Sequence, residues 1–167
     1  DAPLIAEGRA QAEEARAAFA DTPFDVAYSS SLKRALETAR IIADLEPPRL
    51  IVDDLCIERD FGLMEGLTRA EINVKFPEVV YLPVGNSHFS LNPPGGESFD
   101  ALQARARQFL EKLLARHRGQ RIVVFSHQDF LRQLHGVMRG LDPMQALESD
   151  ILNCELNQFH LAADGAL

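Results

Sequence analysis

Hydrophobic positions recur at helical spacing in several stretches of the chain. The clearest stretch is 98–118, in which apolar residues repeat at intervals of three and four and form one continuous face; they are Phe99, Leu102, Ala106, Phe109, Leu110, Leu113 and Leu114. Weaker patterns of the same period predict helices over 7–20 and about 129–139. Two further helices are predicted from Leu32 toward Pro47 and from Thr68 to Pro77, and Thr68 with Glu71 fits a capping box.

Short apolar runs between these helices are typical of strands. The run 121–125 is continuous and rich in β-branched residues, as expected of a strand that is buried on both faces of a parallel sheet. Strands are also predicted over 24–28, 50–52 and 156–161, and a helical turn over 143–147. Alternation of strands and helices predicts an α/β sandwich with a mostly parallel sheet, in which ligands bind beyond the carboxyl ends of the strands.

Two stretches carry no clear periodicity. The stretch 53–67 contains two glycines among charged residues and is predicted to be an ordered loop, a place where function is often found. The stretch 78–97 contains three prolines and three glycines and is predicted to be irregular. Because compact domains seldom leave so many residues without structure, this second stretch is a candidate lid or binding segment. No linker or internal repeat is evident, so residues 1–167 are expected to form one domain.

Composition excludes several classes of function. The chain is 46% hydrophobic and 25% charged, and it has no apolar stretch that would span a bilayer. Its net charge of −8 argues against nucleic-acid binding. The spacing of its two cysteines predicts neither a zinc site nor a disulfide framework, and no metal-binding motif occurs, so no metal or cofactor is expected. A cytoplasmic location is expected because the chain begins without a signal-like segment, and the excess of Arg over Lys fits a bacterial source.

Two residues stand where phosphate could bind. His127 lies between the buried strand and the helix that follows it, where backbone N–H groups and the helix dipole favour an anion. Arg34 falls in the first turn of another helix, where a cation is unfavourable for the helix dipole. A guanidinium grips phosphate with two parallel hydrogen bonds, so the pair would form a cationic pocket. The alternatives are a core histidine bonded to a backbone carbonyl and a solvated surface arginine.

A third candidate lies in the loop at Glu58-Arg59-Asp60. Either carboxyl group could act as a general acid if burial or an anionic neighbour raised its pKa. The alternative is a structural ion pair with Arg59, and the residues alone do not separate the two.

Five segments of the chain match, in order, a known set of motifs. The segment from Tyr28 to Ala39 is similar to the signature Y-S-S-x-L-x-R-A-x-x-T-A, and the segment from Glu58 to Gly66 is similar to E-x-D-F-G-x-W-E-G. Residues 1–12 resemble D-x-P-L-T-x-x-G-x-x-Q-A, with Ile5 in place of threonine, and the segments Pro94 to Ser98 and Val123 to His127 complete the set. Together these motifs resemble those of the histidine phosphatase superfamily, whose fold is that of the phosphoglycerate mutases.

The resemblance implies a three-layer α/β/α sandwich and a phosphomonoester substrate attacked by a histidine, giving a phosphohistidine that water hydrolyses. It implies catalytic roles for Glu58, which protonates the leaving oxygen, and for His127, which stabilises transition-state charge. Arg34, Ser29 and Gln128 are the expected phosphate-binding residues. A phosphatase is expected rather than a mutase, since long insertions are lacking. The sequence does not decide whether the protein forms a homodimer.

The family's R-H-G motif, which supplies the nucleophile on the first strand of the sheet, does not occur in residues 1–167. The fold is therefore expected to lack that strand here, and an upstream segment, a second chain or a rebuilt sheet could fill its place. A non-catalytic phosphate-binding or protein-interaction domain is the alternative function. Gln128-Asp129 also replaces the small residues usual after the family's histidine, and Asp129 is expected to cap the helix or to weaken anion binding.

Overall fold

A three-stranded parallel sheet forms the middle of the molecule. The computed structural model describes residues 1–160. Strand β1 (Val26–Ser29) lies between β2 (Ile51–Val52) and β5 (Ile122–Phe125), and Tyr28 stands opposite both Ile51 and Val124. Within the described part of the chain, β5 pairs with β1 alone. Because the strands run parallel, the carboxyl ends of β1 and β5 meet at one edge of the sheet.

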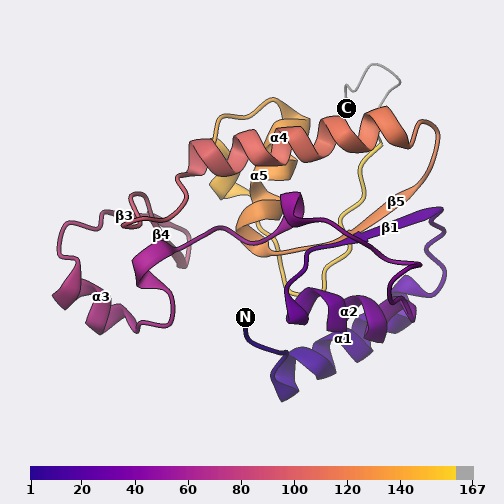
Figure 1. The fold of residues 1–167 in the computed structure, drawn as a ribbon, viewed down its shortest axis with the longest axis horizontal. Helices are drawn as coiled ribbons and strands as arrows, with labels where there is room; N and C mark the ends of the chain where they lie inside the picture. Colours follow the sequence, from indigo (N-terminus) through magenta and orange to yellow (C-terminus); the bar gives the residue numbers. More distant parts are fainter. Residues whose placement is uncertain (161–167) are drawn as a thin grey trace.

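Helices cover both faces of this sheet, as Figure 1 shows. Helices α1 (Ala6–Phe19) and α2 (Lys33–Ala43) pack against each other on one face, and α4 (Phe99–Arg116) and α5 (Gln128–Arg139) do so on the other. The predicted α/β fold with a parallel sheet is confirmed, and the helical periodicity located these four helices to within a few residues. None of the helices in residues 1–160 has the length and apolar character needed to cross a bilayer.

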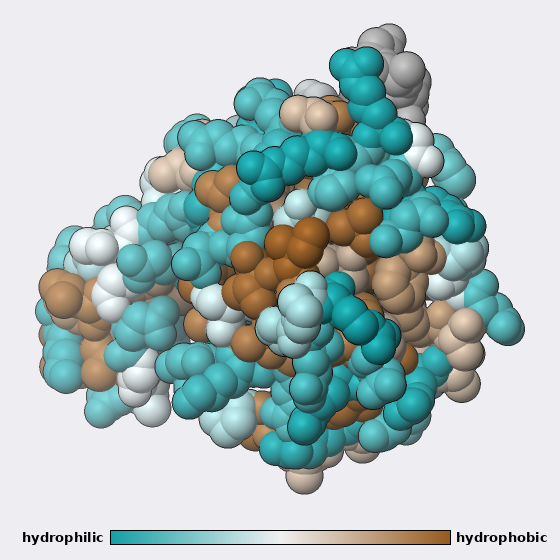
Figure 2. Space-filling view, turned by 45° about the vertical axis from the view of Figure 1, so that its right-hand side comes forward, coloured by the Kyte–Doolittle hydropathy of each residue, from teal (hydrophilic) through white to brown (hydrophobic). Residues whose placement is uncertain are grey.

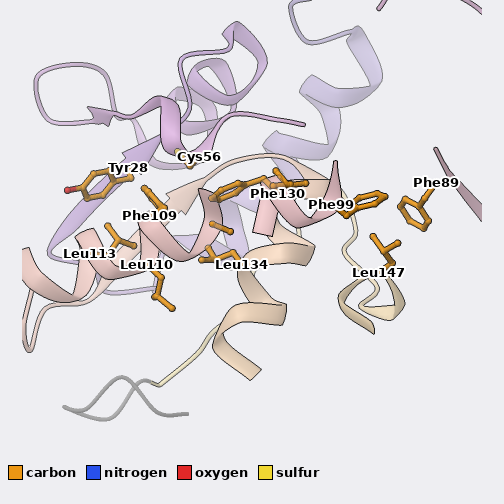
Figure 3. Close-up of a cluster of buried hydrophobic side chains, with 12 residues drawn as sticks. Tyr28, Cys56, Phe89, Phe99, Phe109, Leu110, Leu113, Phe130, Leu134 and Leu147 are labelled. Carbon is orange, nitrogen blue, oxygen red and sulfur yellow. The ribbon is translucent and has the colours of Figure 1, made fainter. Parts of the chain in front are cut away.

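Side chains that alternate along the central strands divide the core in two. Tyr28 and Val124 point to the side of α4 and α5, whereas Ala27 and Phe125 point to the side of α1 and α2. The larger cluster is aromatic: Phe109 stands edge-on to both Tyr28 and Phe130, at centroid distances of 5.7 Å (Figure 3). Such edge-to-face pairs add to the stability gained from burial. Some hydrophobic groups stay at the surface, where Figure 2 shows them among hydrophilic residues.

The stretch predicted to be irregular contains a β-hairpin instead. Strands β3 (Tyr81–Val84) and β4 (Ser87–Ser90) pair in antiparallel fashion and form, with α3 (Arg69–Lys75), a lobe beside the main body (Figure 1). The capping box expected at the start of α3 is present, with Thr68 and Glu71 bonded reciprocally. The prediction for 78–97 was wrong because Gly85-Asn86 forms a two-residue hairpin turn, with Gly85 at a φ of 56°.

Three other details depart from the sequence-based expectations. The loop 53–67 includes short 3₁₀ helices at Asp54–Cys56 and Gly62–Met64. The helical turn predicted over 143–147 is a 3₁₀ helix at Gln145–Glu148. The strand predicted over 156–161 is not formed at 156–160, and Leu161 lies outside the described residues. Within residues 156–160 no backbone group pairs with a strand of either sheet.

Candidate functional site

A cavity of about 560 Å³ opens beside the carboxyl ends of β1 and β5. Its wall includes Arg34 from α2, Glu58 from the loop after β2, and His127 and Gln128 at the start of α5. The chain therefore brings together four of the predicted polar residues, Arg34, Glu58, His127 and Gln128, from three segments far apart in sequence. A position beyond the carboxyl ends of parallel strands is where ligands bind in open α/β sheets.

His127 is buried and is held on both ring nitrogens by side chains. Its Nδ1 accepts a hydrogen bond from Arg34 Nε at 3.2 Å, and its Nε2 lies 2.6 Å from Ser30 Oγ. Since a guanidinium only donates, Nδ1 must be unprotonated, and the neutral ring must carry its proton on Nε2. His127 is therefore a neutral N–H donor toward Ser30, and the alternative of a histidine bonded to a backbone carbonyl does not apply.

The surroundings of His127 keep its ring neutral. Burial, followed by the positive charges of Arg34 and Arg105, lowers the pKa of His127 to about 4. Each of these causes disfavours the imidazolium. A bound anion would act in the opposite direction, because it would offset Arg34 and stabilise a proton on the ring. The protonation state of His127 is thus coupled to whatever occupies the cavity.

Arg34 keeps most of its hydrogen-bonding capacity free. Its Nε is bonded to His127, and within residues 1–160 neither terminal nitrogen of its guanidinium has a hydrogen bond or a carboxylate partner. It is partly buried in the first turn of α2, and it also lines the cavity. These two nitrogens can grip two oxygens of a phosphoryl group. The interpretation as a solvated surface arginine does not fit this position.

Glu58 presents a carboxyl group whose protonated form is favoured. Its Oε1 accepts hydrogen bonds from the backbone N–H groups of Arg59 at 2.9 Å and of Phe130 at 3.3 Å. Burial, and then the negative charge of Asp129, raises the pKa of Glu58, although these backbone donors and Arg34 oppose the rise. A carboxyl group with a raised pKa is suited to donate a proton at moderately acidic to neutral pH.

The loop that carries Glu58 is locked in place by its neighbours. Arg105 on α4 donates hydrogen bonds to the backbone carbonyls of Leu55, Ile57 and Glu58 while it pairs with the Glu97 carboxylate at 2.6 Å. A Cβ on Gly62, whose φ is 55°, would lie 2.4 Å from Gly96 N. Only glycine allows this close approach of the loop to the segment after β4. The sequence reasoning missed Arg105, although a buried-face position on an amphipathic helix could have indicated it.

Asp129 does not cap α5, contrary to expectation. The N-cap residue is His127, which makes no side-chain capping bond, and Asp129 lies within the first turn. Its carboxylate instead faces two buried guanidinium groups, at 4.0 Å from Arg59 Nη1 and 3.5 Å from Arg132 Nη1. Burial raises the pKa of Asp129, and the two arginines oppose that rise. Its charge is thus largely compensated by these two arginines, and Asp129 does not line the cavity that contains Arg34 and His127.

The two other predicted phosphate ligands are engaged elsewhere. Ser29 is fully buried at the end of β1, and its hydroxyl donates to the carbonyl of Ser30 at 3.0 Å. The neighbour, Ser30, is the serine that contacts His127. Gln128 lines the cavity, but its amide donates to the carbonyl of Ile151 at 2.6 Å. Burial could not distinguish these serines, since Ser29 ends the buried strand and Ser30, just beyond it, is equally buried.

The other histidines in residues 1–160 do not contact Arg34. His117 lies 2.8 Å from the hydroxyl of Tyr28, and His135 packs against the ring of Phe159. His88 lies on the hairpin and His160 beside Gln158. Across these same residues no three His, Cys, Asp or Glu side chains are grouped so as to hold a metal ion; the expected absence of a metal stays a prediction.

A family model and curated relatives place the chain in one protein superfamily. The family model described as histidine phosphatase superfamily (branch 1) matches residues 1–167. A 2,3-bisphosphoglycerate-dependent phosphoglycerate mutase 2 of Gloeobacter violaceus is 33% identical over 99% of this chain and 77% of its own length. Phosphoserine phosphatase 1 of Hydrogenobacter thermophilus is 34% identical over 85% of this chain and 67% of its own length.

A solved structure supports the fold. The alpha-ribazole phosphatase of Shigella flexneri superposes with a TM-score of 0.76 at 22% identity, covering 93% of this chain and 79% of its own. At that identity the likeness bears on the fold alone. The sheet and the helices on its two faces are thus features of a shared fold.

Proposed function

The chain belongs to the histidine phosphatase superfamily, and from that premise we propose that it serves the hydrolysis of phosphomonoesters through a phosphohistidine intermediate. The observation that carries this proposal is the convergence of Arg34, neutral His127 and Glu58 on one cavity at the carboxyl edge of the sheet. An arginine with two unused donors, a histidine and a buried carboxyl group together match what phosphoryl transfer requires.

Each of the three residues has a distinct role in the proposed reaction. Arg34 binds two phosphoryl oxygens through its terminal nitrogens, which are unbonded within residues 1–160. The arriving anion raises the pKa of His127, and the imidazolium that then forms offsets the negative charge of the transition state. Glu58 gives its proton to the leaving oxygen and takes one back from the attacking water in the second step.

The nucleophile is the remaining requirement of this mechanism. Residues 1–167 contain no Arg-His-Gly sequence, and none of the histidines other than His127 lies against Arg34 in the described residues. We place the nucleophilic histidine on a strand that pairs with the open edge of β5, supplied by an upstream segment or by a second chain. That edge borders the same cavity, which is lined by Val123 and Val124.

The lack of an Arg-His-Gly sequence in residues 1–167 also favours a second function. Without an Arg-His-Gly strand, Arg34 and His127 would bind phosphate but transfer nothing, and the chain would be a phosphate-binding or protein-interaction domain. Phosphotransfer of the mutase kind is a further possibility, because relatives named as mutases and as a phosphatase are about equally similar. Hydrolysis is preferred because no long insertions separate the motifs.

The test compares residues 1–167 with the same polypeptide fused to an N-terminal strand that ends in Arg-His-Gly. Release of phosphate from ethyl phosphate, whose alkoxide leaving group needs a proton, is expected from the fusion alone, together with an acid-labile phosphohistidine. Glu58→Gln in the fusion should slow release about a hundredfold, since the amide cannot deliver a proton. Glu111→Gln, an exposed change on α4, is the matched control.

Two outcomes would contradict the proposal. Release by residues 1–167 that disappears in both Arg34→Ala and His127→Ala would show that another nucleophile operates. A fusion that binds phosphate yet forms no phosphohistidine would favour the non-catalytic function.

A further inference from the structure

A second cavity, of about 520 Å³, lies between the α3 and hairpin lobe and the start of α5. It adjoins the phosphate cavity, because Gln128 lines both. Arg59 and Asp129 of this second cavity also neighbour Glu58 and Gln128 along the chain. Its size falls within the roughly 300–1,000 Å³ of small-molecule sites. A group attached to a phosphate held by Arg34 can therefore extend toward this recess.

The wall of the recess carries no net charge from its arginines and carboxylates. Two arginines, Arg59 and Arg69, and two carboxylates, Glu65 and Asp129, line it. Asp129 is moreover compensated by Arg132 behind it. A charged leaving group of either sign would therefore gain no net attraction from these four balanced charges. The balance of charge thus favours an uncharged leaving group.

Hydrogen-bonding capacity nevertheless remains unused around the recess. The Asp129 side chain is 12% exposed, and its nearest cations lie at 3.5 and 4.0 Å. The hydroxyls of Tyr81 and Ser90 on the hairpin are buried without a hydrogen-bond partner in the described residues, as are Nη1 of Arg59 and Nη1 of Arg132 beside Asp129. Unmet buried polar groups are costly, and such groups are usually satisfied by water or ligand. A ligand hydroxyl suits this set because it both donates, as Asp129 requires, and accepts.

Aromatic rings supply the rest of the wall. Phe61, Tyr81 and Phe89 line the recess, and the Arg69 guanidinium lies over the Tyr81 ring at 3.2 Å from its centroid. Flat apolar faces beside a few polar groups match a molecule that has C–H faces and hydroxyl edges. That description fits a sugar or polyol better than a simple alkyl chain, which would offer no hydrogen bond to Asp129, Tyr81 or Ser90.

We propose that this recess binds an uncharged, polyhydroxylated leaving group, with Asp129 accepting a hydrogen bond from one of its hydroxyls, so that the substrate is a sugar or polyol phosphomonoester. The inference rests on the proposed function, because it assumes that the phosphoryl group sits at Arg34. It assigns to Asp129 and to the hairpin a part in selecting the substrate.

The test measures the dissociation constants of four phosphomonoesters with residues 1–167 by titration calorimetry. Ribose phosphate carries hydroxyls, phosphoethanolamine a cation, phosphoglycolate an anion, and ethyl phosphate none of these. Ribose phosphate is expected to bind at least about tenfold more tightly than each of the other three, the gain of one hydrogen bond to a charged group.

Asp129→Asn should remove most of that preference, measured as the ratio of the dissociation constant of ethyl phosphate to that of ribose phosphate, and Glu111→Gln is the matched control. Because the substitution leaves two buried arginines less well compensated, circular dichroism checks that the variant is folded. The four titrations with the unaltered protein test the preference for a hydroxylated leaving group even if the variant unfolds.

The outcomes separate this inference from the proposed function. Equal affinities for ribose phosphate and ethyl phosphate would overturn the inference and leave phosphate binding intact, as would tighter binding of the charged esters. Failure of all four esters to bind would contradict the proposed function, and this inference with it.

Discussion

Replacing Arg34 by alanine is expected to weaken the binding of orthovanadate, a phosphate analogue, at least about a hundredfold. Two charge-assisted hydrogen bonds would be lost, each worth about 1.5–3 kcal/mol. The fold should persist, because the guanidinium makes one hydrogen bond, to His127, and no ion pair in residues 1–160. Titration calorimetry on the purified variant, with circular dichroism to check folding, measures both quantities.

Lys33→Ala is the matched control for this experiment. Lys33 is the neighbouring cation, exposed at the start of α2, and it does not line the cavity. Its loss should change vanadate affinity by less than about threefold, the scale of a screened surface charge. Equal affinity losses in the two variants would mean that general charge, and not a specific site, attracts the anion.

Replacing Phe109 by alanine should lower the free energy of unfolding by about 3–5 kcal/mol. Phe109 is fully buried on α4, where it contacts the rings of Tyr28 from the sheet and Phe130 from α5. The substitution opens a cavity between three elements and removes both aromatic pairs. Because the backbone of Phe130 also holds Glu58, vanadate binding should weaken as well. Urea denaturation gives the stability change.

Val74→Ala provides the comparison for stability. Val74 is 82% exposed on α3, so its truncation should change the free energy of unfolding by no more than about 0.5 kcal/mol. A loss below about 1 kcal/mol in Phe109→Ala would show that the aromatic cluster does not hold α4, α5 and the sheet together.

The main layers of the fold could be predicted because each helix has a continuous apolar face. The repeat from Phe99 to Leu114 located α4, and the run before His127 located β5. The hairpin was missed because Pro83 and the later prolines suggested irregular chain. Pro83 is exposed at the edge of a two-stranded sheet, where its missing N–H costs little. The Gly85-Asn86 pair was the available signal of a hairpin turn.

Only those parts of the site that follow from the order of the strands and helices could be predicted from the sequence. Arg34, Glu58 and His127 follow from their places near strand ends, and they do line one cavity. The choice of Ser29 over Ser30 depended on which hydroxyl turns toward His127, which the sequence does not encode locally. The role of Asp129 likewise depends on Arg59, seventy positions away in the chain, whose guanidinium packs over the Phe99 ring.

The central claim is that Arg34 and His127 form a phosphate site, and the most direct measurement follows the His127 ring by NMR as the pH is lowered, with and without inorganic phosphate. Without phosphate, burial and Arg34 should keep the ring neutral until about pH 4. Saturating phosphate should raise that pKa by at least about one unit, because the anion offsets Arg34 and favours the imidazolium. An identical titration curve in saturating phosphate, or a free ring that titrates near its ordinary value, would contradict the account.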